Sequence, residues 1–303
     1  MKFNSIGGFA VSALLIAAPL SIASAADMPL KAPPAPPVAA PGWTGWYVGV
    51  NAGYGWNSDS VNVVGTPLFA NPLAPAGTVP SLAAAVASTT GSFPVHSKGF
   101  IGGGQIGYNK QFDKFVVGLE ADIQGASIRG SSTVAGPSVG IVGFPGNSAQ
   151  TALTLSNKLN YLGTLRGDLG VTVTPTVLFY GTGGLAYGGV NSNTTVAQAL
   201  VGPGTATVNV PYGTSAGFSG TRVGWTAGAG LAWMLPATNW SAKVEYLYYD
   251  LGNVSYGGTM TNIVGPPGGA VPTGAPFYTL GVGSSTRFNG NIVRVGLNYK
   301  FSN

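Results

Sequence analysis

The sequence predicts an all-β fold, an eight-stranded antiparallel up-and-down transmembrane β-barrel. The first observation is composition: of 303 residues 49 are glycine, only 7% are charged, and the mean hydropathy is +0.29. That is too apolar and too rich in glycine for an ordinary helical or α/β domain. The other two observations are segments that alternate apolar with small or polar residues, and connections that alternate between short and long.

The N-terminus reads as a signal peptide covering residues 1–25. Lys2 gives a thin positive region, Phe9 to Leu20 form an apolar core, and Ala23-Ser24-Ala25 is a small-residue cleavage site. Export makes the absence of cysteine informative, because a secreted domain could have used disulfides. Stability must then come from backbone pairing and burial.

A proline-rich segment follows, and we expect residues 26–42 to form an extended periplasmic linker. The barrel should occupy residues 43–303. The stretch TGWYVGVNAGYGW shows its pattern best: Trp46, Val48 and Val50 share one face, while Gly49 and Asn51 share the other.

The same alternation predicts seven further strands, at about 98–111, 115–127, 158–171, 177–188, 222–235, 240–251 and 288–301. Short turns are expected at FDK, TVTPT and LPATN, and long loops at about 58–97, 128–157, 189–221 and 252–287. Short turns on one rim and long loops on the other are typical of outer-membrane barrels, in which the long loops face outward.

Aromatic placement favours this barrel over a soluble β-sandwich, whose strands also alternate. Aromatic residues near strand ends suit the girdles at the two membrane interfaces, whereas a sandwich core would favour strand middles. The predicted girdle residues are Trp43, Trp46, Trp56, Trp225, Trp233, Trp240, Tyr108, Tyr180, Tyr248, Tyr299 and Phe301.

Inside each predicted strand, the charged residues fall on the face opposite to the apolar residues. In GLEADIQG, Glu120 and Asp122 alternate with Leu119, Ala121 and Ile123, so the acids should face the lumen. A lysine or arginine on the lipid face would cost about 2 to 4 kcal/mol. The sequence therefore predicts an ion-paired network in the lumen, made of Glu120, Asp122, Arg166, Asp168, Lys243, Glu245 and Arg294, with Lys300 nearer the periplasmic mouth.

Other kinds of site find little support. The carboxylate pair could do acid–base chemistry, but nothing sets one acid apart from basic neighbours. The single histidine, His96, has no obvious metal-ligand partners, so neither a metal nor a cofactor is expected. An outer-leaflet lipid hydrolase would use His96 as base with Ser92 or Ser97 nearby. The 13 basic residues are scattered, which argues against nucleic acid.

Taken together, several segments resemble the RopB-like outer-membrane proteins of Gram-negative bacteria, a "porin family" with an OmpA-like β-barrel. They are AADMPLKAPPAPP, WTGWYVGVNAGYGW, GFIGGGQIGYN, FVVGLEADIQGA, YLGTLRGDLGV, LFYGTGGLAYG, WSAKVEYLYYDLG and NIVRVGLNYKF. The resemblance implies location in the cell outer membrane, surface exposure, a role in membrane integrity and action as a surface antigen. It also implies as partners the outer-membrane lipids, lipopolysaccharide and the barrel-assembly machinery, with Tyr299 and Phe301 as the assembly signal.

Three functional hypotheses follow. The first is a non-enzymatic structural and surface barrel whose lumen is closed by the ion pairs. The second is a narrow diffusion porin for small solutes, and the third is the lipid hydrolase. A filled and charge-balanced lumen favours the first hypothesis, because an eight-stranded barrel is only wide enough for side chains to fill it. Conduction, a surface ligand and the oligomeric state are left open.

Overall fold

A computed structural model of the chain describes residues 42–70, 78–142, 145–202, 212–262 and 278–301. The predicted signal peptide, and the predicted linker up to residue 41, lie outside the described residues. Among the described residues, no helix is long or apolar enough to cross a membrane.

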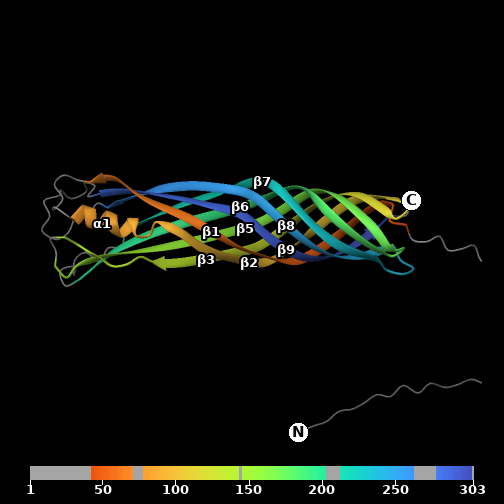
Figure 1. The fold of residues 1–303 in the computed structure, drawn as a ribbon, viewed down its shortest axis with the longest axis horizontal. Coiled ribbons are helices and arrows are strands. Elements are labelled where there is room, and N and C mark those ends of the chain that lie inside the picture. The colour runs from red at the N-terminus through yellow and green to blue at the C-terminus, as the bar shows by residue number, and fades with distance from the viewer. Residues whose placement is uncertain (1–41, 71–77, 143–144, 203–211, 263–277, 302–303) are drawn as a thin grey trace, which may run out of the picture. The chain divides into compact units, whose positions relative to one another are not determined.

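The long strands form one antiparallel sheet that closes into a ring in its periplasmic half (Figure 1). Each long strand pairs with the next along the chain, and β1 pairs with β9 to close the ring. The predicted all-β, up-and-down barrel with eight strands in its ring is thereby confirmed. The strands are β1 Gly45–Ala70, β2 Gly91–Phe112, β3 Phe115–Ala135, β5 Ser148–Thr174, β6 Val177–Val201, β7 Tyr212–Met234, β8 Trp240–Asn262 and β9 Tyr278–Lys300, with a two-residue strand β4 Val139–Gly140 and a helix α1 Thr78–Ala87.

We call the end of the barrel with the short turns the periplasmic end and the opposite end the outer end, following the orientation that the sequence predicts. The strands extend much further at their outer ends than the sequence predicted. Their periplasmic ends agree with the prediction to within a few residues, but β1 continues to Ala70 and β5 already begins at Ser148. The predicted long loops were therefore wrong over most of their length, and α1 was missed. The reason is a change in the pattern of hydropathy. In the outer parts of the strands the apolar residues face the interior and the polar residues face outward, the reverse of the pattern in the other half.

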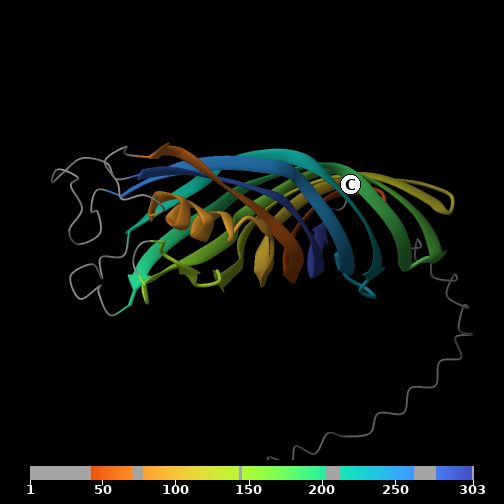
Figure 2. The same cartoon turned by 60° about the vertical axis from the view of Figure 1, so that its left-hand side comes forward.

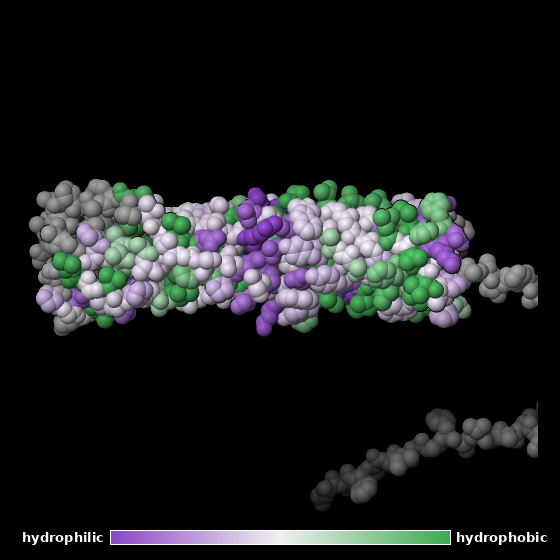
Figure 3. Space-filling view, viewed as in Figure 1, coloured by the Kyte–Doolittle hydropathy of each residue, from purple (hydrophilic) through white to green (hydrophobic). Residues whose placement is uncertain are grey.

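In the periplasmic half of the barrel, apolar side chains point outward: Leu119 and Ile123 are exposed on the surface. In the outer half, Leu153 and Leu155 are fully buried and Thr154 between them is exposed. A strand surrounded by lipid presents apolar residues outward, whereas one surrounded by water buries them. Figure 3 shows a hydrophilic band near the middle of the viewed face, with hydrophobic residues over the half that leads to the C-terminus.

Above that level the ring divides into two sheets. The pairing of β2 with β3 ends at Lys98 and Arg129, and the pairing of β7 with β8 ends at Trp225 and Asp250. Within the described residues, β8-β9-β1-β2 and β3-β5-β6-β7 continue outward as separate four-stranded sheets. Both sheets and α1 contribute to one apolar cluster: Val61, Val63, Ala85, Val86, Val95, Ile141, Ala149, Leu153, Leu155, Val196, Met260, Leu280 and Val282. This outer half resembles a small β-sandwich (Figure 2).

Most predicted girdle aromatics lie on the outside. Trp46 contacts Tyr108, with ring centroids 5.3 Å apart, and Trp240 contacts Tyr299 at 5.2 Å. Two assignments were wrong: Trp43 and Tyr180 are only 5% exposed and pack inside the periplasmic end. Tyr180 has inward parity, and the backbone N–H of Trp43 donates to Gln111, which holds the segment before β1 across the mouth.

Candidate functional site

The candidate site is a cluster of charged side chains inside the periplasmic half of the barrel. Alternate residues of a strand share a face, so β3 sends Glu120 and Asp122 inward together. The register then places Arg166 of β5 directly opposite Glu120, and Arg294 of β9 directly opposite Glu245 of β8. The local alternation and the strand register together bring these side chains to one level of the lumen.

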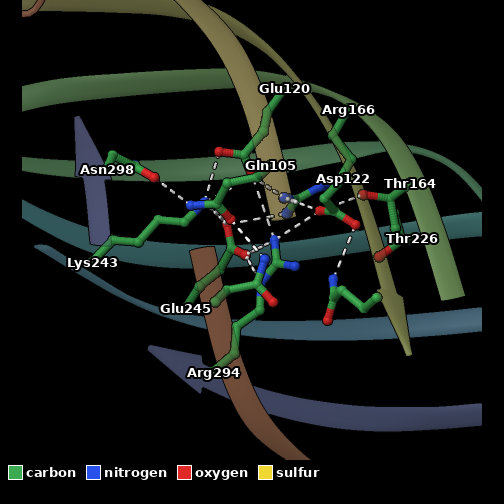
Figure 4. A network of polar contacts seen from close by, with 12 residues as sticks. Gln105, Glu120, Asp122, Thr164, Arg166, Thr226, Lys243, Glu245, Arg294 and Asn298 are labelled. Carbon is green, nitrogen blue, oxygen red and sulfur yellow. Dashed lines mark hydrogen bonds and ion pairs between the residues drawn. The ribbon is translucent and has the colours of Figure 1, made fainter. Parts of the chain in front are cut away.

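Glu120 contacts all three bases of the cluster (Figure 4). Its carboxylate forms an ion pair with Arg166, and the Lys243 ammonium lies 2.7 Å from both of its oxygens. The Arg294 guanidinium is 3.4 Å away, and the Tyr47 hydroxyl donates a hydrogen bond of 2.7 Å. Three bases from three other strands thus converge on one acid.

The other two acids are held in the same way. Asp122 Oδ2 lies 3.0 Å from Nη2 of both Arg166 and Arg294. Glu245 lies 3.0 Å from Nη1 of Arg166 and accepts a 2.6 Å hydrogen bond from Nε of Arg294. Each acid therefore contacts at least two bases, and each arginine bridges all three acids.

The network balances its own charge. It contains three acids, Glu120, Asp122 and Glu245, and three bases, Arg166, Lys243 and Arg294, whose side chains are at most 4% exposed. Ions buried to this degree lose several kcal/mol of hydration each, which only close pairing and hydrogen bonding can offset. Removing one member leaves an uncompensated charge among apolar neighbours.

Asp168, the seventh predicted member, stands apart. No ion pair joins it to the other described residues, and it is only half-buried. It lies two residues beyond Arg166 toward the periplasmic turn, where it lines a cavity of about 160 Å³ together with Glu120, Lys243, Tyr47 and Tyr180. Lys300 is at the same mouth, where its ammonium donates to the Gly42 carbonyl.

Uncharged partners complete the network, and the sequence analysis did not assign them to it. The Tyr180 hydroxyl donates to Glu245 at 3.0 Å, and Asp122 accepts from Thr164 at 2.9 Å and from Gln124 at 3.0 Å. Tyr47 shares a face with Gly49 and Asn51, so its inward parity could have been read from TGWYVGVNAGYGW. The parity of Tyr180 was equally readable.

Apolar side chains inside the barrel lie on both sides of the charges. Toward the outside they are Ile101, Ile128, Leu159, Leu162, Ala186, Val190, Leu247, Tyr249, Leu251, Val254, Phe288 and Ile292. Toward the periplasmic end they are Trp43, Val116, Leu178, Tyr180, Ala232 and Met234. Apolar clusters thus lie toward both ends of the lumen, and on the periplasmic side the network also borders the cavity lined by Glu120, Asp168 and Lys243.

The residues considered for lipid hydrolysis do not assemble a catalytic pair. His96 is exposed and Ser97, the next residue of β2, is buried, so their side chains point to opposite faces. Ser92 shares the His96 face, but four residues of extended strand span about 13 Å. His96 Nδ1 instead lies 3.1 Å from the Ser58 hydroxyl across the β1–β2 ladder. Within the described residues, no three or more His, Cys, Asp or Glu side chains gather as a metal site would require.

The predicted assembly residues lie at the periplasmic rim. Tyr299 is near the end of β9, its ring 5.6 Å from that of Phe301 and 5.2 Å from that of Trp240. Phe301 is exposed, and its backbone N–H donates to the Trp46 carbonyl. The C-terminal aromatics are therefore presented on the outer surface next to the β1–β9 closure.

Comparisons with known proteins agree with this architecture. Residues 13–301 match the family model described as outer membrane protein beta-barrel domain. The chain is 34% identical over 283 residues to a 31 kDa outer-membrane immunogenic protein of Brucella melitensis, covering 92% of this chain and 93% of the relative. It is 31% identical over 238 residues to the 25 kDa outer-membrane immunogenic protein of the same species, covering 77% and 79%.

Among solved structures, the outer membrane protein OprG from Pseudomonas aeruginosa aligns over 86% of this chain and 98% of its own, with 11% identity and a TM-score of 0.35. The family match covers nearly the whole chain. The chain also aligns with an outer-membrane protein over most of the length of both proteins. The chain therefore belongs to the outer membrane protein β-barrel domain family and is a protein of the outer membrane.

Proposed function

We propose that this protein is a non-enzymatic structural barrel that supports the integrity of the outer membrane and presents its outer half on the cell surface. The observation that carries this proposal is the neutral network of six ion-paired charges, with apolar clusters toward both ends of the lumen. We expect such a lumen to offer no continuous polar path to ions or solutes. The outer sandwich adds a water-facing surface beyond the membrane.

Several features support the finer points of this proposal. The resemblance to RopB-like proteins supports a role in membrane integrity, and the Brucella relatives are named as immunogenic proteins of the outer membrane. Lipopolysaccharide, outer-membrane lipids and the barrel-assembly machinery are the partners that this role requires. The proposed chain organisation has a signal peptide at 1–25, a periplasmic linker at 26–42 and the barrel from residue 43.

A conductance measurement tests the closed lumen. Folded protein, verified by its heat-modifiable mobility on gels, is inserted into planar lipid bilayers. We expect a near-silent trace, and we expect no hydrolysis of added phospholipid by the same preparation. A steady conductance whose ion selectivity changes in Glu120→Gln would instead establish a diffusion porin, because the acids would then line an open pore.

A second measurement tests the role in the membrane. Cells lacking the protein should become more sensitive to detergents and to large antibiotics, and expression of the full chain should restore resistance. A variant with Asp113→Asn, in the exposed periplasmic turn between β2 and β3, should restore resistance as fully as the wild type. Unchanged sensitivity in cells lacking the protein would contradict the structural role.

A further inference from the structure

Three basic residues form one row on the outer surface of the barrel. Lys98 of β2 lies directly opposite Arg129 of β3, which lies directly opposite Lys158 of β5. Lys98 and Arg129 are exposed, and Lys158 is half-buried on the same outward face. Directly opposite residues on neighbouring strands have Cβ atoms about 5 Å apart, so the Cβ atoms of the three basic residues lie within about 10 Å.

No acid of the described residues neutralises this row. None of the three basic side chains takes part in an ion pair there, and Asp113, in the periplasmic turn, is the one exposed acid of the described residues. Like charges directly opposite each other on neighbouring strands are destabilising. By contrast, Arg287, another outward-facing base of the outer half, is paired with Asp250. The row is therefore an unmatched cationic surface.

The row lies where the apolar surface of the barrel ends. Trp56 is directly opposite Lys98 on the β1 side, and Phe100, two residues nearer the periplasm on the same face, is 74% exposed. The Phe100 ring contacts Tyr54 edge to face, with centroids 5.3 Å apart. On the other side of the row, Ser131 and Ser156 face each other. Aromatic residues next to basic ones, at the edge of an apolar belt, are placed at the level of lipid headgroups.

We propose that Lys98, Arg129 and Lys158 form a binding site for the phosphate groups of an anionic lipid in the outer leaflet. The arginine in the middle can offer a fork of N–H donors to a phosphate, with an ammonium on each side. The exposed aromatic surface at Phe100 and Tyr54 lies directly below, where the acyl chains of that lipid would pack. That apolar shelf favours a lipid over a soluble polyanion. The inference relies on the membrane orientation in the proposed function, but it does not depend on a closed lumen.

Lipid-binding measurements on the full chain test this site. The protein is placed in nanodiscs of neutral phospholipid with a small fraction of a diphosphorylated glycolipid of the lipid A type, and the bound glycolipid is counted by native mass spectrometry. The double variant Lys98→Gln/Lys158→Gln should bind it at least about tenfold more weakly. The matched control Lys110→Gln/Lys114→Gln removes two exposed lysines at the periplasmic end and should bind like the wild type. Added salt should weaken wild-type binding.

The outcomes are separable. Equal binding by the Lys98→Gln/Lys158→Gln variant, or equal binding of the dephosphorylated glycolipid, would overturn the site. Displacement of the lipid by a soluble sulfated polysaccharide that binds more tightly would also overturn the site. Heat-modifiable mobility of each variant shows that it is folded, and the conductance trace is recorded on the same samples. An open pore with intact lipid binding would contradict only the proposed closed lumen.

Discussion

Glu120 of β3 and Arg166 of β5 are direct cross-strand partners whose charged groups meet inside the barrel, and both residues are at most 2% exposed. Each also contacts charges on more distant strands: Glu120 binds Lys243 of β8, and Arg166 binds Glu245. The pair therefore ties neighbouring strands to the far side of the ring. Its removal should affect the whole lumen and not only one ladder.

Replacing Glu120 tests this coupling. Glu120→Ala leaves three bases against two acids, and breaking a buried pair typically costs about 3 to 5 kcal/mol. We expect a lower free energy of unfolding in denaturant, or, if water enters to hydrate the stranded base, a conductance above that of the wild type. The double variant Glu120→Ala/Arg166→Ala restores the charge balance and should recover part of the loss. Additive losses in the double variant would contradict a coupled network, and Asp113→Asn in the exposed turn serves as the neutral control.

We expect the stability of the outer half to depend on pH through the carboxyl of Asp59. Asp59 lies on β1 beyond Trp56, and burial raises the pKa of its carboxyl from 3.8 to about 6. The nearby charge of Asp250 also raises this pKa. Hydrogen bonds from Asn57 and the Asn289 backbone and the charge of Arg287 lower it, each by less than burial raises it. The folded protein therefore keeps a proton that the unfolded chain has lost between these pH values. The contribution of Asp59 to the free energy of unfolding should therefore fall as the pH rises from 3.8 to about 6 and then level off.

The variant Asp59→Asn should lack that part of the decrease. Urea unfolding curves of wild type and variant at several pH values between 4 and 7 would measure the difference, which isolates Asp59 from other titrating groups. A variant with the same pH dependence as the wild type would show that Asp59 is not the group responsible.

The two ends of β5 offer a test of orientation. The chain contains no cysteine, so a single introduced thiol is labelled uniquely. Thr154 is exposed in the outer half, and Thr174 is exposed at the periplasmic turn of the same strand. A membrane-impermeant thiol reagent should label Thr154→Cys on intact cells and Thr174→Cys only after the outer membrane is permeabilised. Labelling of Thr174→Cys alone on intact cells would reverse the topology.

Replacing Phe301 should impair assembly of the barrel. If Tyr299 and Phe301 are read by the assembly machinery, Phe301→Ala should reduce the amount of folded, heat-modifiable protein in the outer membrane. Deletion of Ser302 and Asn303 should leave that amount unchanged or raise it. Phe112→Ala is a matched control, because Phe112 is also an exposed aromatic at the same rim, on β2. Normal assembly of Phe301→Ala would rule out the signal.

The alternation along the chain was enough to predict the fold class and the direction of the charges. In the periplasmic half, side chains have a period of two and one face meets lipid, so Glu120, Asp122 and Arg166 could only face inward. The same reasoning failed in the outer half, because Leu153 and Leu155 alternate in the opposite sense where water replaces lipid. Two strands also change their inward parity at bulges, between Leu159 and Tyr161 and between Asp250 and Asn253.

By itself, then, the sequence determined which charged residues enter the lumen, because every strand in lipid must turn its charges inward. Only the tertiary structure decided which of them meet. Lys243 reaches Glu120 across 123 positions of sequence, and Asp168 stays outside the network although it shares the face of Arg166. The relative heights of residues on different strands depend on the register and tilt of a closed ring. Strand alternation carries no information about register, so the pairing of the charges, the inward Tyr180 contact and the division into two outer sheets emerge only when the ring closes.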